Sequence, residues 1–196
     1  MALSALVLCS RALLRIGAQP IASLEEGTAE AEVAANLYAG TRDALLAAHP
    51  WNFATGQMVL PRLVATPVAD ESYAFQMPPT CLRVLSAGAG GYNSGFGGRG
   101  RGLDYRIHEN RLHAAAPQVV LTYIFRPEER VFPPHFASAL VARLAAEFCI
   151  PITDSTSRAE MLQRLAGAEF KEARLIDSQQ STVQAIEGFP LIDVRG

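Results

Sequence analysis

The sequence predicts an α+β fold, in which N-terminal and C-terminal helix pairs pack together and an antiparallel β meander over about residues 54–125 is inserted between them. Two observations predict this layout. Apolar residues recur at helical spacing up to residue 50 and again from residue 132, and the period falls to that of strands in between. Hydrophobic residues make up 49% of the 196 residues, which is enough to build a core. We therefore expect a single domain over residues 1–196.

Two helices are expected before residue 50. The first covers residues 2–16 and ends at Gly17, a good C-cap. Thr28 is the expected N-cap of the second, which runs to about Ala48. The apolar stripe predicted for the first helix is Leu3, Leu6, Val7, Ser10 and Leu14, and that for the second is Ala34, Leu37, Tyr38, Thr41, Leu45 and Ala48.

The stretch HPWNFAT, residues 49–55, links the helices to the strands. Pro50 disfavours helical backbone at His49, so the second helix should stop there. The stretch contains Trp51, the only tryptophan, together with Phe53. We expect these two aromatic residues to have a structural role and to fill the junction between the helices and the strands.

Short strands are expected after this link, and the most readable segment is YRIHENRLHA at residues 105–114. If Glu109 and Asn110 form a two-residue hairpin loop, one face carries Tyr105, Ile107, Leu112 and Ala114, and the other carries Arg106, His108, Arg111 and His113. The remaining strands are expected near residues 54–60, 72–76, 82–87 and 118–125. The last of these is apolar on both faces, which indicates an interior strand.

Two further helices are expected in the helical part that covers residues 132–180. The third runs from about Pro134 to Cys149 and is ended by Pro151; Ser157 and Glu160 fit a capping box that opens the fourth. The stripe of the third is Leu140, Val141, Leu144, Ala145 and Phe148, and that of the fourth is Leu162, Leu165, Ala166, Phe170, Ala173 and Ile176. Residues 181–196 lose this periodicity, which predicts an extended C-terminal tail.

The formal net charge is −2, from 17 basic and 19 acidic residues, so bulk attraction to nucleic acid is not indicated. Cys9, Cys81 and Cys149 have no metal-type spacing and are read as reduced, semi-buried thiols. The apolar N-terminus lacks a basic leading region, and no stretch is judged long enough to span a bilayer. We expect an unexported protein with no membrane partner.

The glycine-rich patch at residues 88–102 admits three interpretations. It contains no phosphate-binding motif, because GxxxxGK[ST] is absent and the only lysine is Lys171. It is either a mobile tip between two strands, a loop that becomes ordered against a neighbouring subunit, or a nucleic-acid-binding segment that uses Arg99 and Arg101.

The search for reactive groups gives no candidate. The four histidines lack metal-site spacing, and His108 and His113 are flanked by arginines, which oppose a divalent cation. No GxSxG motif or nucleophilic cysteine signature is present. We expect no metal, no cofactor and no enzymatic activity, although catalytic groups can be brought together in space from distant positions. A small hydrolase therefore stays open as the least favoured alternative.

The residues LLRIGAQPIASLEEG and the WNF step, together with PPTCLRVL, YRIHENRLH, VVLTYIFR, LVARLAAEFCIPIT and ARLIDSQ, resemble the tail tubular protein A family in an ordered set that covers most of the chain. This family comprises head-to-tail adaptors of short-tailed phages, with related adaptors in gene transfer agents and prophages. The glycine-rich patch does not map onto the family pattern.

The resemblance implies a virion structural protein, made in the bacterial host cytoplasm and located at the head–tail junction. Its expected partners are copies of itself in a ring that is commonly twelve-fold, the portal protein, and the tail nozzle or tube protein, with DNA only passing through the lumen. Residues expected at interfaces are Arg99, Arg101, Arg106, His108, Arg111, His113, Phe189, Leu191 and Ile192. The alternatives are a nucleic-acid-binding module built on the patch at residues 88–102 and, less favoured, a cell-wall hydrolase, an activity suggested for some members of the family.

Overall fold

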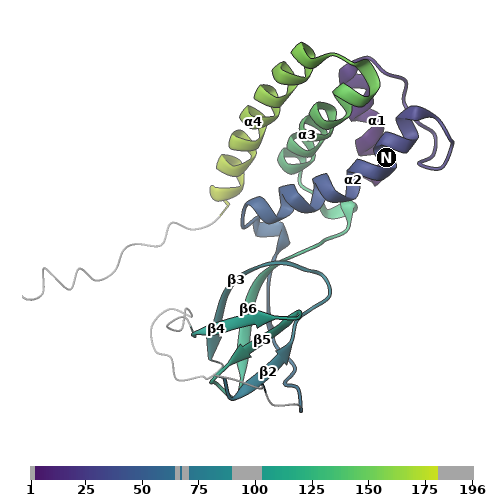
Figure 1. Cartoon of the computed structure of the whole chain (residues 1–196). Coiled ribbons are helices and arrows are strands. Elements are labelled where there is room, and N and C mark those ends of the chain that lie inside the picture. Colours follow the sequence, from purple (N-terminus) through teal and green to yellow (C-terminus); the bar gives the residue numbers. More distant parts are fainter. Residues whose placement is uncertain (1–2, 65–66, 68–70, 90–102, 181–196) are drawn as a thin grey trace, which may run out of the picture.

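The computed structural model describes residues 3–64, 67, 71–89 and 103–180. Within them, four α-helices and two small antiparallel sheets confirm the predicted α+β class. Figure 1 shows the helices gathered at one end of the molecule and the strands at the other, with α2 lying next to the strands. The predicted tail at residues 181–196 and most of the glycine-rich patch lie outside the described residues.

Helix α1 (Ala5–Ile16) begins at Ser4, whose side chain accepts a hydrogen bond from the Val7 amide, and ends at Gly17 as predicted, with φ of 80°. The predicted buried stripe is wrong. The buried residues are Leu8, Cys9, Ala12, Leu13 and Ile16, whereas Leu14 is 58% exposed. Both sets of residues have helical spacing, because α1 is apolar almost all round, so its sequence pattern does not decide which face is inside.

Helix α2 (Ala29–Ala48) has the predicted start and end. Thr28 Oγ1 accepts a hydrogen bond from the Ala31 amide at 3.3 Å, and His49 takes up extended backbone in front of Pro50. Its buried residues are Ala31, Ala34, Tyr38, Leu45 and Leu46, so the predicted stripe is right at three positions.

Helices α3 (Pro134–Thr153) and α4 (Thr156–Ser178) both differ from prediction at the ends that meet. Pro151 lies inside α3, which continues to Thr153; the Thr153 hydroxyl donates to the Cys149 carbonyl at 2.6 Å. The predicted capping box is wrong, because Ser155 caps α4 by accepting from the Arg158 amide. A proline in the last turn of a helix removes only one hydrogen bond, so α3 continues past it.

Helix α3 is the central element of the bundle and packs against α1, α2 and α4. All five residues of its predicted stripe are buried. Contrary to the expectation that no stretch could span a bilayer, the 20 residues of α3 have sufficient length and mean hydropathy, 1.5 over 18 residues. Since 61% of that window is buried inside the protein, its apolar composition is that of a core helix.

The strands form two three-stranded antiparallel sheets, and their order differs from that of a simple meander. β1 (Thr55–Val59), β6 (Val119–Phe125) and β3 (Cys81–Ala89) form one sheet in that order. β2 (Tyr73–Gln76), β5 (Arg111–Ala114) and β4 (Tyr105–His108) form the other. Among the described strands, β4 and β5 are the only pair that are both consecutive in the sequence and hydrogen-bonded to each other. β6 is the central strand of its sheet, in agreement with the interior strand that its sequence predicted.

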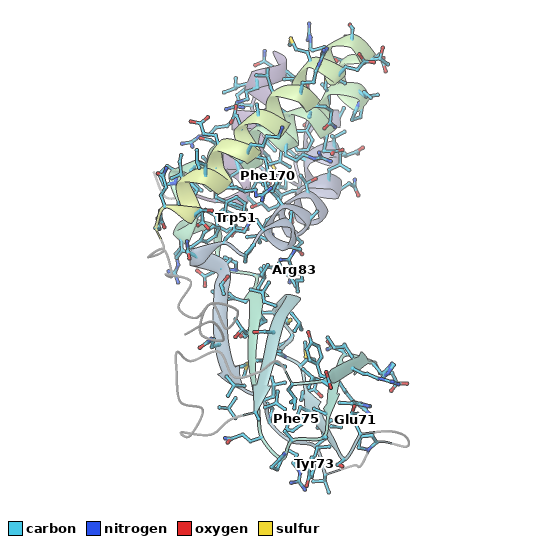
Figure 2. The ribbon with its side chains drawn as sticks, turned by 90° about the vertical axis from the view of Figure 1, so that its left-hand side faces the viewer. Trp51, Glu71, Tyr73, Phe75, Arg83 and Phe170 are labelled. Atoms are coloured by element: carbon cyan, nitrogen blue, oxygen red, sulfur yellow. The ribbon has the colours of Figure 1, made fainter. Side chains whose placement is uncertain are left out.

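Two groups of buried residues correspond to the two ends of the molecule. The larger contains the interior of the helices together with Trp51, Ala54 and Ile124. The smaller lies between the two sheets and consists of Leu60, Phe75, Met77, Ala87, Leu112, Ala114, Val119 and Leu121. In Figure 2, Trp51 and Phe170 mark the helical core, Arg83 the junction, and Phe75 with Tyr73 the distal end of the strands.

Candidate interaction surfaces

The β4–β5 hairpin has the loop and the pairing that the sequence predicted. Glu109 and Asn110 both have positive φ, 49° and 58°, as a two-residue hairpin loop requires. His108 pairs with Arg111 and Arg106 with His113. Since directly paired residues lie on the same face of a sheet, Arg106, His108, Arg111 and His113 share one face. We name these four residues the basic hairpin face.

The opposite face of the hairpin covers the smaller core. Leu112 and Ala114 are fully buried and Tyr105 is half-buried, whereas Ile107, on the edge strand β4, is 45% exposed. On the basic hairpin face, the His108 and His113 rings lie 5.7 Å apart, edge to face. The Nε2 atom of His113 is buried and has no hydrogen-bond partner among the described residues. The basic hairpin face therefore combines exposed cations with one unsatisfied imidazole nitrogen.

Trp51 fills the junction between helices and strands, as predicted. It is completely buried and donates its indole N–H to the Leu45 carbonyl at 3.1 Å. Its ring packs edge-on against Phe136, at 5.0 Å between centroids, and against Phe170, at 5.9 Å. Phe53 packs against Phe136 at 5.0 Å. These contacts join the end of α2 to α3 and α4, which makes the aromatic cluster structural.

Beside Trp51 lies a polar cluster around a buried carboxylate, which the sequence did not reveal. Asp177, in the last turn of α4, is only 1% exposed. Its carboxylate accepts from the Asn52 amide at 3.2 Å, and its carbonyl accepts from Asn52 Nδ2 at 2.7 Å. His49 Nε2 and His135 Nε2 lie 3.4 and 3.8 Å from its two carboxylate oxygens. We name Asp177, Asn52, His49 and His135 the Asp177 cluster.

Burial lowers the pKa of His49, and the nearby charges of Arg174 and Arg83 act in the same direction, while the carboxylate of Asp177 opposes them. His135 Nε2 is buried without a hydrogen-bond partner in the described part of the chain. The one sequence signal for this cluster was indirect. An acid at a helix C-terminus and a histidine at a helix N-terminus both oppose the helix dipole, so each needs a specific partner.

A second network connects α2 to the segment between β6 and α3. Asp43 accepts from Arg126 Nη2 at 2.6 Å and from Arg42 Nε at 2.9 Å. Glu129 accepts from Arg42 Nη1 and from the Tyr38 hydroxyl, both at 3.0 Å. Burial raises the pKa of Asp43, but the hydrogen bonds and charges of Arg126 and Arg42 outweigh it, and the net shift is downward.

A groove of about 540 Å³ runs between α2 and α4. Small residues line much of it: Gly40, Ala44, Ala48, Ala166 and Gly167. Arg143 and Glu147 of α3 and Phe170 of α4 also line it. We name it the α2–α4 groove.

Helix α4 also has a large exposed apolar surface, Met161, Leu165 and Leu175, exposed by 50%, 49% and 61%. We name these three residues the α4 ridge. Leu165 and Gly167 are two residues apart, which is about 200° around a helix. The α4 ridge therefore lies on the side of α4 opposite the groove.

The described residues offer no obvious reactive centre. Within residues 3–64, 67, 71–89 and 103–180, no group of three or more His, Cys, Asp and Glu side chains could hold a metal ion. Burial raises the pKa of Cys9 to about 12 and also raises that of Cys81, so both thiols stay protonated at neutral pH.

The other residues predicted at interfaces are Arg99, Arg101, Phe189, Leu191 and Ile192, and all five lie outside the described residues. The structure thus brings together Arg106, His108, Arg111 and His113, and it places Trp51 in the core with Phe53 packed against that core. The α4 ridge and the Asp177 cluster are additions to the sequence prediction. A scan of models of protein families gives no match to this chain, and neither does a comparison with curated proteins.

Proposed function

We propose that this chain is a structural head-to-tail connector, of which copies form a ring between a portal protein and a tail nozzle or tube. DNA passes through the lumen of the ring as transient cargo. The proposal includes no catalytic activity and no cofactor. It places the protein in the virion at the head–tail junction, after synthesis in the bacterial host cytoplasm.

The observation that carries the proposal is the α4 ridge. Met161, Leu165 and Leu175 are each about half exposed or more, and they point away from both α3 and the groove. A cluster of large apolar side chains at a protein surface typically marks an interface with another protein. The ridge thus supports a contact that a single subunit leaves open.

A ring needs two different surfaces on each subunit, because a heterologous contact joins one patch to another patch of the next copy. The basic hairpin face is chemically unlike the α4 ridge and lies at the other end of the molecule (Figure 1). The Asp177 cluster and the bonds of Asp43 to Arg126 hold the helices and the strands together. Such bonds favour a fixed geometry between the two surfaces, as ring closure requires.

The charge fits a channel for DNA. With a net charge of −2, the protein as a whole does not attract phosphate strongly. A surface that lines a DNA passage has to let the duplex slide, and a nearly neutral, slightly acidic subunit favours this. The sequence resemblance to ring-forming adaptors points in the same direction.

The experiment is sedimentation velocity on the full chain, alone and mixed with the portal protein of the same genome. We expect wild type to form ring-sized species, and the Leu165→Glu variant to lose them because a charge then lies in the contact. Gln163→Glu is the matched control, since it adds the same charge on the groove side of α4. A wild-type chain that stays monomeric in both conditions, or a Leu165→Glu variant that assembles normally, would contradict the proposal.

A further inference from the structure

The α2–α4 groove is open in a way that the fold of the subunit does not explain. Gly40 and Gly167 lie within α2 and α4, and a Cβ atom added to either would meet no atom within 4 Å. A glycine inside a helix costs about 1 kcal/mol relative to alanine. Because no neighbouring atom excludes a side chain there, packing within the described subunit does not require either glycine. The two glycines widen the groove, so another segment of polypeptide can approach the two helices closely.

The groove is suited to an apolar segment of chain. On the α2 side the groove is lined by Leu37, Ala44, Leu45 and Ala48. On the α4 side it is lined by Phe170, whose ring also packs against the buried Trp51. Polar groups occur as well: Thr41 and Gln163 line it, and so do Arg143 and Glu147, which form an ion pair at 2.7 Å. An extended peptide with bulky apolar side chains matches the apolar part of this surface.

The chain's own C-terminal segment has this composition. Residues 181–196 contain Phe189, Leu191 and Ile192, followed directly by Asp193. Pro190 lacks a backbone N–H, so this stretch has one donor fewer to satisfy in an apolar groove.

The segment also starts at the right place. The last turn of α4 is held by hydrogen bonds from Asn52 to Asp177, and Asn52 is only four residues after Ala48, at the end of the groove. Phe170 lies ten residues before Gln180, about 15 Å along the helix. The nine residues from Gln180 to Phe189 span up to about 30 Å when extended, so Phe189 can reach well into the groove.

We propose that residues 181–196 fold back on their own subunit and occupy the α2–α4 groove, with Phe189, Leu191 and Ile192 against its small-residue walls. The occupant is the same chain and not a neighbouring copy, because a tether this short gives an effective concentration in the millimolar range. This inference goes beyond the connector role and holds whether or not rings form.

The test is a disulfide between the groove and the segment. In the full chain with Cys81→Ser, the pair Ala44→Cys and Phe189→Cys is oxidised at high dilution, and products are read by intact mass and non-reducing gel. Ala44 is exposed, so its replacement leaves the core unchanged. We expect most chains to be cross-linked as monomers. The control pair Ala168→Cys and Phe189→Cys, with its first cysteine on the opposite side of α4, should cross-link at least severalfold more slowly.

A second variant separates docking from random encounter. Gly40→Leu with Gly167→Leu fills the groove, and both changes are compatible with folding because each added side chain enters open space. In this background we expect cross-linking of Ala44→Cys with Phe189→Cys to fall roughly tenfold, which corresponds to a moderate loss of binding free energy. Ala168→Leu, a change of similar size on the far side of α4, should leave it unchanged.

Three results would overturn the inference: no cross-link, a cross-link rate equal to that of the control pair or insensitive to the glycine substitutions, or cross-linked dimers in place of monomers. The last result would assign the groove to a neighbouring copy. Since the experiment is run on dilute subunits, failure of ring assembly leaves its outcome unaffected, and the two proposals can fail separately.

Discussion

The helical end and the strand end of this molecule are built with very different amounts of buried apolar surface. The helical core includes the whole interior of α3, and its fully buried members include the large side chains Trp51, Phe136, Phe148 and Leu140. Among the described residues, the core between the sheets has eight buried members, and Phe75 is the only aromatic one of them. Because stability follows the apolar area removed from water, the helical end should support the strand end.

Contacts at the junction connect the strands to the helical core. Trp51 and Ala54 precede β1 and Ile124 belongs to β6, yet all three are part of the helical core. The Asp43–Arg126 bonds add a second connection from α2 to the end of β6. The strands are thus attached through both of the chain segments that enter and leave them. Substitutions at the junction, in the smaller core and in the ion pairs test this dependence.

The largest effect is expected for Trp51→Ala. Removing a fully buried indole, together with its hydrogen bond to Leu45, should lower the free energy of unfolding by about 3–5 kcal/mol. Chemical denaturation followed by far-ultraviolet circular dichroism measures this, since the only tryptophan is lost. We expect both ends of the molecule to be destabilised together. A denaturation midpoint equal to that of wild type would contradict the assignment of Trp51 as the junction residue.

Leu112→Ala should produce a smaller and more local effect. Leu112 is fully buried between the sheets, and its loss should cost about 2–3 kcal/mol, at the lower end of the range because a small core can relax around the gap. Amide hydrogen exchange should accelerate in β2, β5 and β4 and stay unchanged in α3. Ile107→Ala, its half-exposed cross-strand neighbour, is the matched control and should cost less. Equal acceleration in α3 would mean that the two ends unfold as one unit.

The Asp177 cluster should make stability depend on pH. Since the folded-state pKa of His49 lies below its ordinary value of 6.5, the unfolded chain binds more protons as the pH falls through that region. The contribution of His49 to stability is therefore fully present above about pH 6.5 and is lost as the pH falls toward its folded pKa.

Denaturation midpoints of wild type and His49→Gln at pH 7.5 and pH 5.5 test this prediction. The facing charges, Asp177, Arg174, Arg83 and His135, are common to both proteins, so only the difference between them reports on His49. We expect wild type to lose more stability than the variant on acidification. Parallel loss in the two proteins would show that His49 is not responsible.

The smallest effect is expected for Arg126→Ala. The pair with Asp43 has three hydrogen bonds, of 2.6 to 3.1 Å, but the arginine side chain is 41% exposed and its attraction is screened by solvent. A double-mutant cycle with Asp43→Asn should give a coupling free energy of about 0.2–1 kcal/mol. A coupling well above this range would show that the pair is a main support of the junction and not an addition to Trp51.

The sequence was sufficient for features that are specified locally. The loop at Glu109 and Asn110 fixes the hairpin register. Helix α3 is apolar almost all round, so its sequence pattern predicts correctly that most of the helix is buried. The sequence was insufficient where several packing arrangements are compatible with the same pattern of apolar residues. Helix α1 offers two apolar stripes, and short strands can pair in many orders, so the division into two sheets depends on tertiary packing.

The candidate surfaces divide in the same way. The basic hairpin face follows from strand alternation and was predicted in full. The α4 ridge was not, because Leu165 fits the helical stripe of α4 and was assigned to the core. The Asp177 cluster joins residues that are far apart in the chain, which no local pattern can reveal. Long-range pairing was thus the information missing from the sequence.

The most direct test of the connector role is electron microscopy of the full chain mixed with the portal protein of the same genome. We expect rings of this protein, commonly twelve-fold, stacked on the portal with an open central channel. Portal particles without an added ring, at a concentration of this protein well above that of the portal, would contradict it.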